Sequence, residues 1–202
     1  MKQNIVFDMG GVLLDFSEQR LLTHYFGGCS LEEQAQVREA IFGSGIWRRM
    51  DRGDFDAAET SRAICTLLPE RLHPLVQRMI PNYFEAMPPI PETNELAVQL
   101  KARGKRIYLL TNAPYIFMEE QRRVPCIDLF DGIFASCEVR LLKPQREIYL
   151  AFFERFHLNA ADCFFVDDMR ENIDGAAAVG MEGFCFAQRD IAGLRKALGI
   201  DS

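Results

Sequence analysis

The stretch from Ile5 to Phe16 reads Ile-Val-Phe-Asp-Met-Gly-Gly-Val-Leu-Leu-Asp-Phe and decides the fold. It begins as a short apolar run, which is typical of a buried strand, and it delivers the carboxylate of Asp8 onto a glycine-rich turn. A side chain at the end of a buried strand is rigidly aimed, and Gly10 and Gly11 allow the backbone to approach a ligand closely. The stretch therefore predicts a carboxylate that is presented to a ligand.

A second stretch ends in the same way. Residues 163–168 read Cys-Phe-Phe-Val-Asp-Asp, an apolar run that ends in the pair Asp167 and Asp168. If the two strands lie side by side in a parallel sheet, their acids meet at its carboxyl edge, where open α/β folds bind ligands. Three carboxylates at one edge predict a site for a divalent cation.

The pattern of the remaining sequence predicts the rest of the sheet. From residue 92 onward, strand-like runs over 105–111, 132–136, 162–167 and 183–187 alternate with helical patterns over 92–103, 115–122, 145–157, 170–179 and 190–198. Parallel strands joined by right-handed helical crossovers give this alternation. We expect an α/β fold with a doubly wound, Rossmann-like parallel sheet.

The stretch between the first two predicted strands carries helical patterns instead. Two helix starts fit the capping-box pattern, Ser30 with Glu33 and Asp56 with Glu59. The proline-rich segment 87–91 then favours an extended connector, because proline cannot continue a helix. We expect a catalytic core formed by residues 1–16 and 87–202, and a small helical cap, residues 17–86, inserted after the first strand.

The composition narrows the class of protein and its partners. A formal net charge of −6 argues against nucleic-acid binding, which needs a basic surface. No apolar stretch is long enough to span a bilayer, and the first residues lack the pattern of a secretory signal. We therefore expect a cytoplasmic protein without a membrane partner. The six cysteines include no CxxC pair and are predicted to be reduced core residues.

Four motifs at predicted strand ends resemble those of the haloacid dehalogenase-like (HAD) hydrolase superfamily, in its helical-cap branch. The motifs are Phe7-Asp8-Met9-Gly10-Gly11-Val12-Leu13, Leu109-Leu110-Thr111-Asn112, Lys143-Pro144 and Val166-Asp167-Asp168-Met169-Arg170-Glu171-Asn172. The resemblance covers nearly the whole chain and is strongest to sugar-phosphate phosphatases, including the bacterial α-D-glucose-1-phosphate phosphatase group. It implies a Mg²⁺-dependent phosphomonoester hydrolase that acts on a small-molecule phosphate ester, such as a sugar phosphate, through an aspartyl-phosphate.

The resemblance also implies the roles of the acidic motifs. Asp8 would attack phosphorus as the nucleophile. Mg²⁺ would be held by the Asp8 carboxylate, the backbone carbonyl of Gly10 and the Asp168 carboxylate, because a hard cation prefers oxygen ligands. Asp167 and Asn172 would support the metal site.

The two other motifs would bind the phosphate group. Thr111 would donate its hydroxyl to a phosphate oxygen, together with the backbone amide of Asn112, which is expected at a helix start. Lys143 would place a positive charge on the phosphate and orient the nucleophile.

One position departs from the pattern of the superfamily. Most of its phosphatases carry a second aspartate two positions after the nucleophile as general acid and base, and Gly10 stands there in this chain. Losing such a group typically lowers the rate by about 10² to 10⁴. The leaving group, water or another side chain must then supply the proton, and a sugar 1-phosphate with its good leaving group would suffer least. Asp15 is one candidate substitute, with a purely structural role as the alternative.

The expected cap carries a weaker signal. Trp47, Arg48, Arg49 and the turn 51–54 lie between predicted helices, where a cap loop approaches the active site of such enzymes. These side chains would either hold a sugar and its phosphate, or Trp47 would pack between helices and the arginines would be solvated.

Two other functions remain open on the sequence. A 2-haloacid dehalogenase also uses an aspartate nucleophile, but it attacks carbon without magnesium, and the acids Asp167 and Asp168 would repel its carboxylate substrate. A non-catalytic phosphate-metabolite-binding protein would have kept the fold after losing the acid–base aspartate at Gly10. The presence of the other motif side chains weighs against this second alternative.

Overall fold

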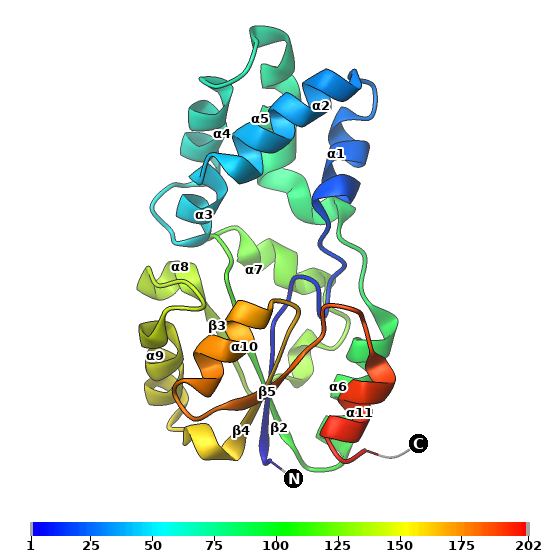
Figure 1. Ribbon diagram of the computed structural model, residues 1–202, viewed down its shortest axis with the longest axis vertical. Coiled ribbons are helices and arrows are strands. Elements are labelled where there is room, and N and C mark those ends of the chain that lie inside the picture. Colours follow the sequence, from blue (N-terminus) through cyan, green and yellow to red (C-terminus); the bar gives the residue numbers. More distant parts are fainter. Residues whose placement is uncertain (1, 201–202) are drawn as a thin grey trace.

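The computed structural model describes residues 2–200, and at its centre lies one parallel sheet (Figure 1). The strand order is β3-β2-β1-β4-β5, and every neighbouring pair is parallel. The strands are β1 (Asn4–Phe7), β2 (Arg106–Thr111), β3 (Gly132–Ala135), β4 (Cys163–Asp167) and β5 (Glu182–Cys185). The predicted α/β fold with a doubly wound sheet is confirmed.

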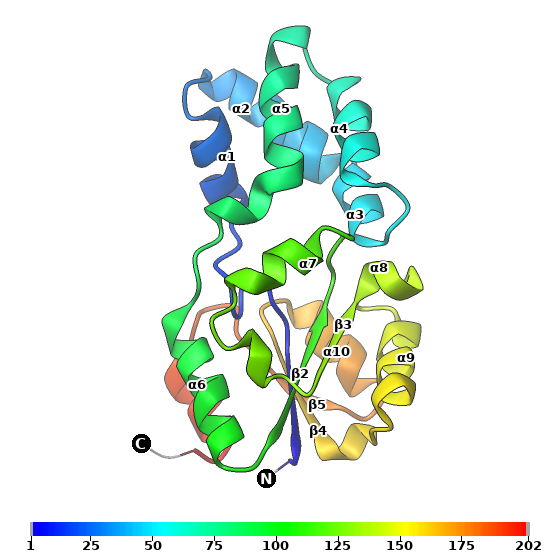
Figure 2. The same ribbon diagram turned by 180° about the vertical axis from the view of Figure 1, so that it is seen from behind.

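Helices cover both faces of the sheet. Figures 1 and 2 show α6 (Pro91–Ala102) and α11 (Ile191–Ala197) on one face, and α9 (Arg146–Phe156) and α10 (Arg170–Ala177) on the other. Successive residues of β1 serve opposite faces: Ile5 and Phe7 join the core cluster under α6 and α11, whereas Val6 joins the cluster under α9 and α10. Because both faces are buried, the strands read as continuous apolar runs.

The chain between β1 and β2 forms a helical lobe, residues 18–86, over the carboxyl edge of the sheet (Figure 1). Its helices are α1 (Glu18–Phe26), α2 (Leu31–Arg38), α3 (Ile46–Asp51), α4 (Ala57–Cys65) and α5 (His73–Met79), with a π-helical turn (Glu39–Gly43) and 3-10 segments (Glu70–Leu72 and Ile80–Ala86). Both predicted capping boxes form, at Ser30 and at Asp56. The assignment of residues 17–86 as a cap separate from the core stays a prediction.

Two linkers side by side join the lobe to the sheet. The Asp15 amide donates to the carbonyl of Pro88 at 2.8 Å, and the Ile90 amide donates to the carbonyl of Leu13 at 2.9 Å. The buried side chain of Asn94 donates from Nδ2 to the carbonyls of Leu13 at 2.9 Å and Ile90 at 2.8 Å. The N-terminal turn of α6 therefore fixes both linkers.

Two elements differ from their predicted bounds: the helix that follows β2, and the strand β3. The helix expected over 115–122 is shorter: α7 spans Phe117–Glu120 and continues as a 3-10 turn over Gln121–Arg123. The strand expected over 132–136 ends at Ala135, because the chain turns into α8 (Ser136–Val139), and the Ser136 hydroxyl accepts the Ala113 amide at 2.9 Å. Further 3-10 turns span Ile127–Leu129 and Ala160–Asp162.

Two observations on residues 2–200 bear on the predictions from composition. No helix of this part of the chain is long and apolar enough to cross a bilayer. All six cysteines are free thiols, and four of them are buried, as expected for core residues.

We predict that Asn94→Ala destabilises the fold by about 2 to 4 kcal/mol, because it removes two hydrogen bonds to buried carbonyls. Equilibrium denaturant unfolding measures this. Glu95→Ala, at an exposed position of the same helix, should change stability by no more than about 0.5 kcal/mol. Equal effects of the two substitutions would contradict the role assigned to Asn94.

Candidate active site

Asp8 lies directly after β1, at the carboxyl edge of the sheet. Its amide donates to the carbonyl of Val166 in β4 at 2.8 Å, so the backbone ladder fixes its position. The carboxylate oxygen Oδ1 accepts the Met9 amide at 2.8 Å and lies 2.8 Å from Lys143 Nζ. The side chain is therefore held through Oδ1.

Lys143 is a buried cation, 3% exposed, that joins two strand ends. Its Nζ lies 2.8 Å from Asp8 Oδ1 and 2.7 Å from Asp167 Oδ2, and donates to the Leu110 carbonyl at 3.1 Å. Burial alone would lower the pKa of Lys143, but Asp167 and Asp8 outweigh it and the pKa is raised. Its three N–H groups have protein partners in Asp8, Asp167 and Leu110, and its predicted contact with phosphate stays a prediction.

Asp167 is fully buried and supports the site from β4. Its Oδ1 accepts the Met169 amide at 2.8 Å and Asn172 Nδ2 at 2.9 Å, and its Oδ2 accepts the Lys143 ammonium. Both oxygens are therefore occupied. The supporting position predicted for Asp167 and Asn172 agrees with these contacts, although their roles in the reaction stay predictions.

Asp168 approaches the glycine turn closely. Gly11 has φ +74°, and a Cβ added to it would lie 2.3 Å from Asp168 Oδ2. Only glycine combines this left-handed backbone with the open space that the carboxylate occupies. Gly11, which was expected to let the backbone approach a ligand, thus makes room for the Asp168 carboxylate.

The acidic cluster fits a divalent cation. One carboxylate oxygen from each of Asp8, Asp167 and Asp168 lies within 4.8 Å of the others. Burial raises the pKa of Asp8 to about 7, opposed by Lys143 and reinforced by Asp167 and Asp168. Burial and then Asp167 raise the pKa of Asp168 to about 6. A hard cation between these oxygens would offset both effects, and Asp8 and Asp168, with the Gly10 carbonyl, are the donors left for it.

The second motif is positioned mainly by the third. Thr111 ends β2 and lines the pocket beside Asp8. Asn112 accepts the Lys143 amide on Oδ1 at 2.8 Å and donates from Nδ2 to the Lys143 carbonyl at 3.1 Å. The expectation that Asn112 stands at a helix start was wrong, because α7 begins only at Phe117, beyond Pro114. Asn112 instead ties the loops after β2 and before α9 together.

A cavity of about 310 Å³ extends from this cluster toward the helical lobe. The sheet edge and α7 contribute Asp8, Met9, Gly10, Thr111, Asn112, Glu120, Lys143, Asp168, Met169 and Asn172, and the lobe with its linkers contributes Phe16, Glu18, Phe42, Trp47, Arg48, Asp51, Tyr83 and Met87. One wall is aromatic: Trp47 packs against Phe42 and Tyr83, with ring centroids 5.3 and 4.9 Å apart. All the predicted site residues except Asp167 line this cavity.

Only some of the candidate residues from the expected cap line the cavity. Trp47 and Arg48 line the cavity, whereas Arg49 stacks on Phe55, with its guanidinium carbon 3.9 Å from the ring centroid. Asp54 pairs with Arg52. Two of these side chains in α3 therefore line the cavity, whereas Arg49 and the Arg52–Asp54 pair make contacts outside it.

Asp15 does not occupy the place of the missing acid. Its carboxylate pairs with Arg20 at 2.6 Å and with Arg189, and it does not line the cavity. Two guanidinium partners suit a carboxylate with a structural role rather than a substitute general acid.

Sequence reasoning did not single out Glu120 and Tyr83. Glu120 is only 3% exposed and accepts the Tyr83 hydroxyl at 2.5 Å on Oε2. Burial raises the pKa of Glu120 from 4.5 to about 7, although Tyr83 opposes the shift. The local sequence around Glu120 is a run of charged residues, so no local pattern marks it as buried.

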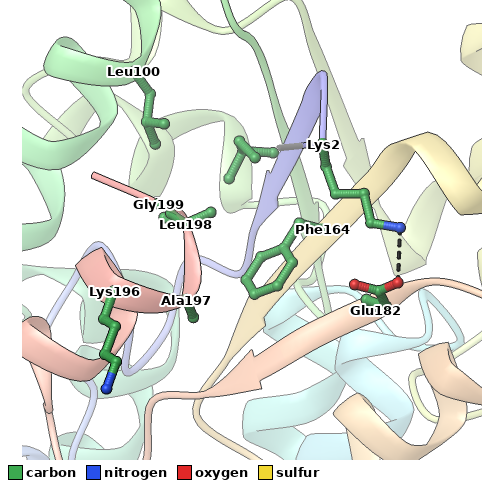
Figure 3. A pocket seen from close by; sticks show the side chains of 9 residues that line it. Lys2, Leu100, Phe164, Glu182, Lys196, Ala197, Leu198 and Gly199 are labelled. Atoms are coloured by element: carbon green, nitrogen blue, oxygen red, sulfur yellow. Dashed lines mark ion pairs between the residues drawn. The ribbon is translucent and has the colours of Figure 1, made fainter. Parts of the chain in front are cut away.

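A larger cavity, of about 480 Å³, lies at the opposite, amino edge of the sheet (Figure 3). Phe164, Leu100 and Leu198 line it, and Lys2 pairs with Glu182 across it at 2.9 Å. None of the motif residues lines it, so the cavity beside Asp8 is the candidate active site.

Comparison with known proteins identifies the family of this chain. The model of the haloacid dehalogenase-like hydrolases matches residues 2–180. The chain belongs to the haloacid dehalogenase-like hydrolase family. A sesquiterpene phosphatase of Aspergillus oryzae is 29% identical over 183 residues, which cover 88% of this chain and 86% of that protein. A D-ribitol-5-phosphate phosphatase of Bacteroides thetaiotaomicron is 24% identical and covers 91% of each chain.

A solved structure shares the fold of this HAD hydrolase. It is a HAD-family enzyme of Bacteroides thetaiotaomicron, in complex with magnesium and inorganic phosphate. The TM-score is 0.73 at 20% identity, over 91% of this chain and 93% of that one. The predicted membership of the HAD superfamily is confirmed by the family match over residues 2–180.

We predict that Gly11→Ala lowers Mg²⁺ affinity by more than about tenfold. The new methyl group would displace the Asp168 carboxylate and strain a left-handed backbone, which costs about 1 kcal/mol. Gly10→Ala is the matched control, because its Cβ would lie at an ordinary 3.5 Å from Phe16 Cβ. This control should lose far less Mg²⁺ affinity than Gly11→Ala. Isothermal titration calorimetry checks this, and equal losses would contradict the account.

We predict that the stability of Glu120→Gln relative to wild type rises by up to about 3 kcal/mol between pH 5 and pH 8.5. The folded pKa of about 7 lies above 4.5, so the proton stabilises the fold at low pH. The wild type loses that stability as pH rises through about 7, because Glu120 then loses its proton. The variant has no titratable group at position 120 and does not lose it. Denaturant unfolding at both pH values measures it.

Glu119→Gln, at the exposed neighbouring position, is the control and should follow the wild-type pH dependence. A stability difference between Glu120→Gln and wild type that stays constant with pH would contradict a raised pKa at Glu120.

Proposed function

We propose that this hydrolase is a Mg²⁺-dependent phosphatase that acts on a small phosphate ester, and specifically a sugar phosphate, through an aspartyl-phosphate on Asp8. One observation carries the proposal: the Asp8 carboxylate, which is held by a buried lysine, lies within 4.8 Å of the Asp168 carboxylate, and both line one cavity. The relatives named as phosphatases support a phosphate ester as the substrate.

The side chains and backbone groups of the site would act one after another in the reaction. Lys143 and the Met9 amide hold Oδ1 of Asp8, so Oδ2 attacks phosphorus, forming the Asp8–phosphorus bond as the ester bond breaks. Thr111 donates its hydroxyl to a phosphate oxygen. Mg²⁺, when bound at Asp8, the Gly10 carbonyl and Asp168, offsets the repulsion between carboxylate and phosphate. Water then attacks phosphorus and releases inorganic phosphate, which restores Asp8.

The wall opposite the acidic cluster supports a sugar as the organic part. The rings of Trp47, Phe42 and Tyr83 suit the apolar face of a sugar ring, and Arg48 and Glu120 on the same cavity suit its hydroxyl groups. A 2-haloacid is disfavoured, because its carboxylate would face Asp167 and Asp168 beside the nucleophile.

We predict that Asp8→Asn lowers phosphate release by at least about 10⁴-fold, and that excess chelator abolishes it in the wild type. The assay uses sugar 1-phosphates, sugar 6-phosphates, a polyol phosphate and a prenyl phosphate, with chloride release from 2-chloropropionate in parallel. Glu171→Gln, an exposed acid of the fourth motif, should keep wild-type activity.

Two results would overturn the proposal. Metal-independent chloride release would favour a dehalogenase. A folded wild-type protein that binds phosphate esters and releases no phosphate would favour a binding protein.

A further inference from the structure

The proposed phosphatase reaction lacks a proton donor at the expected place, and this inference rests on that proposed function. Gly10 has no side chain, and a Cβ there would already contact Phe16. An alkoxide is a poor leaving group unless an acid protonates it. Besides Asp8 and Asp168, three carboxyl groups line the cavity: Glu18, Asp51 and Glu120.

Asp51 is held over the cavity by contacts between the lobe and the sheet edge. It ends α3, and its backbone carbonyl accepts the Ser136 hydroxyl at 2.5 Å. The same hydroxyl accepts the Ala113 amide at 2.9 Å. Gly53, two residues on, has φ +80°, and a Cβ there would lie 2.9 Å from the Cys137 carbonyl oxygen. The end of α3 is therefore fixed against the loops that follow β2 and β3.

The surroundings of Asp51 favour its protonated form. Burial raises its pKa well above the ordinary value, and the charges of Glu120 and Asp8 raise it further. A hydrogen bond from Trp47 and the charge of Arg48 oppose the shift without cancelling it. Asp51 and Asp8 both line this cavity, so the two carboxyl groups face the same enclosed space.

The other two carboxyl groups are already engaged. Glu18 pairs with Arg38, with 2.8 Å between Oε2 and Nε. Glu120 accepts the Tyr83 hydroxyl, so its orientation is set by the lobe. Glu120 and Tyr83 thus pair with each other in the cavity wall and do not offer a donor to the ester.

We propose that Asp51, from the helical lobe, is the general acid and base of the reaction, in place of the side chain that Gly10 lacks. As Asp8 forms its bond to phosphorus, the Asp51 carboxylic acid gives its proton to the departing ester oxygen, which leaves as a neutral alcohol. The Asp51 carboxylate then takes a proton from water as the water oxygen attacks phosphorus. The bond between phosphorus and Asp8 breaks, and Asp51 is protonated again. Glu120 is a positioning residue that keeps the proton on Asp51.

The test is a leaving-group series of aryl phosphates, from nitrophenyl to unsubstituted phenyl, with an alkyl phosphate at the far end. We expect Asp51→Asn to lower kcat by about 10² to 10⁴ on the alkyl ester and by less than about tenfold on the nitrophenyl ester. A plot of log kcat against leaving-group pKa should therefore be steeper than in the wild type.

Two variants control the comparison. Asp54→Asn, three residues away and paired with Arg52 outside the cavity, should keep the wild-type slope. Glu120→Gln should lower kcat more on the alkyl ester than on the nitrophenyl ester, but with a smaller change of slope than Asp51→Asn. Thermal unfolding and Mg²⁺ titration establish that Asp51→Asn is folded and keeps its metal site.

An equal loss on all esters, or a steeper slope in Glu120→Gln than in Asp51→Asn, would overturn the assignment of Asp51. Wild-type protein that releases no phosphate from any ester, or Asp8→Asn that keeps releasing it, would instead overturn the proposed function itself.

Discussion

A buried lysine between two buried carboxylates holds the carboxyl edge of the sheet together. Lys143 reaches from the loop before α9 to Asp8 after β1 and Asp167 at the end of β4, at 2.8 and 2.7 Å. Removing one partner of a buried ion pair typically costs about 3 to 5 kcal/mol, because the other charge is left without compensation. Stability and chemistry therefore depend on the same contacts, and β1 and β4 must be neighbours for those contacts to form.

One lysine does not balance the three acids of the cluster. Asp167 has both oxygens engaged, so the uncompensated charge falls on Asp8 and Asp168. One carboxylate oxygen of Asp168 and one of Asp8 lie within 4.8 Å of each other, so that charge is concentrated at one point of the sheet edge. A site of this kind suits a divalent cation bound together with a phosphate group, because the positive charge of the cation offsets the negative charges of the carboxylates and of the phosphate.

The fold and the acidic cluster could be predicted from the sequence because their signals are local. Apolar runs that end in Asp8 and in Asp167 identify strands and their carboxyl ends, and the alternation with helices identifies the parallel sheet. The pairing of Asp15 with Arg189 and of Glu120 with Tyr83 joins residues far apart in the chain. Such pairs depend on how the helical lobe packs on the sheet, which local periodicity does not contain.

The account requires a covalent bond between Asp8 and phosphorus during turnover. Borohydride reduces an acyl phosphate to an alcohol, so quenching the steady-state reaction with borohydride and sequencing the peptides by mass spectrometry tests it directly. The account predicts homoserine at position 8 in the presence of substrate and Mg²⁺, and unmodified aspartate when either is left out. Turnover without modification at position 8, or with reduction at another acid, would contradict it.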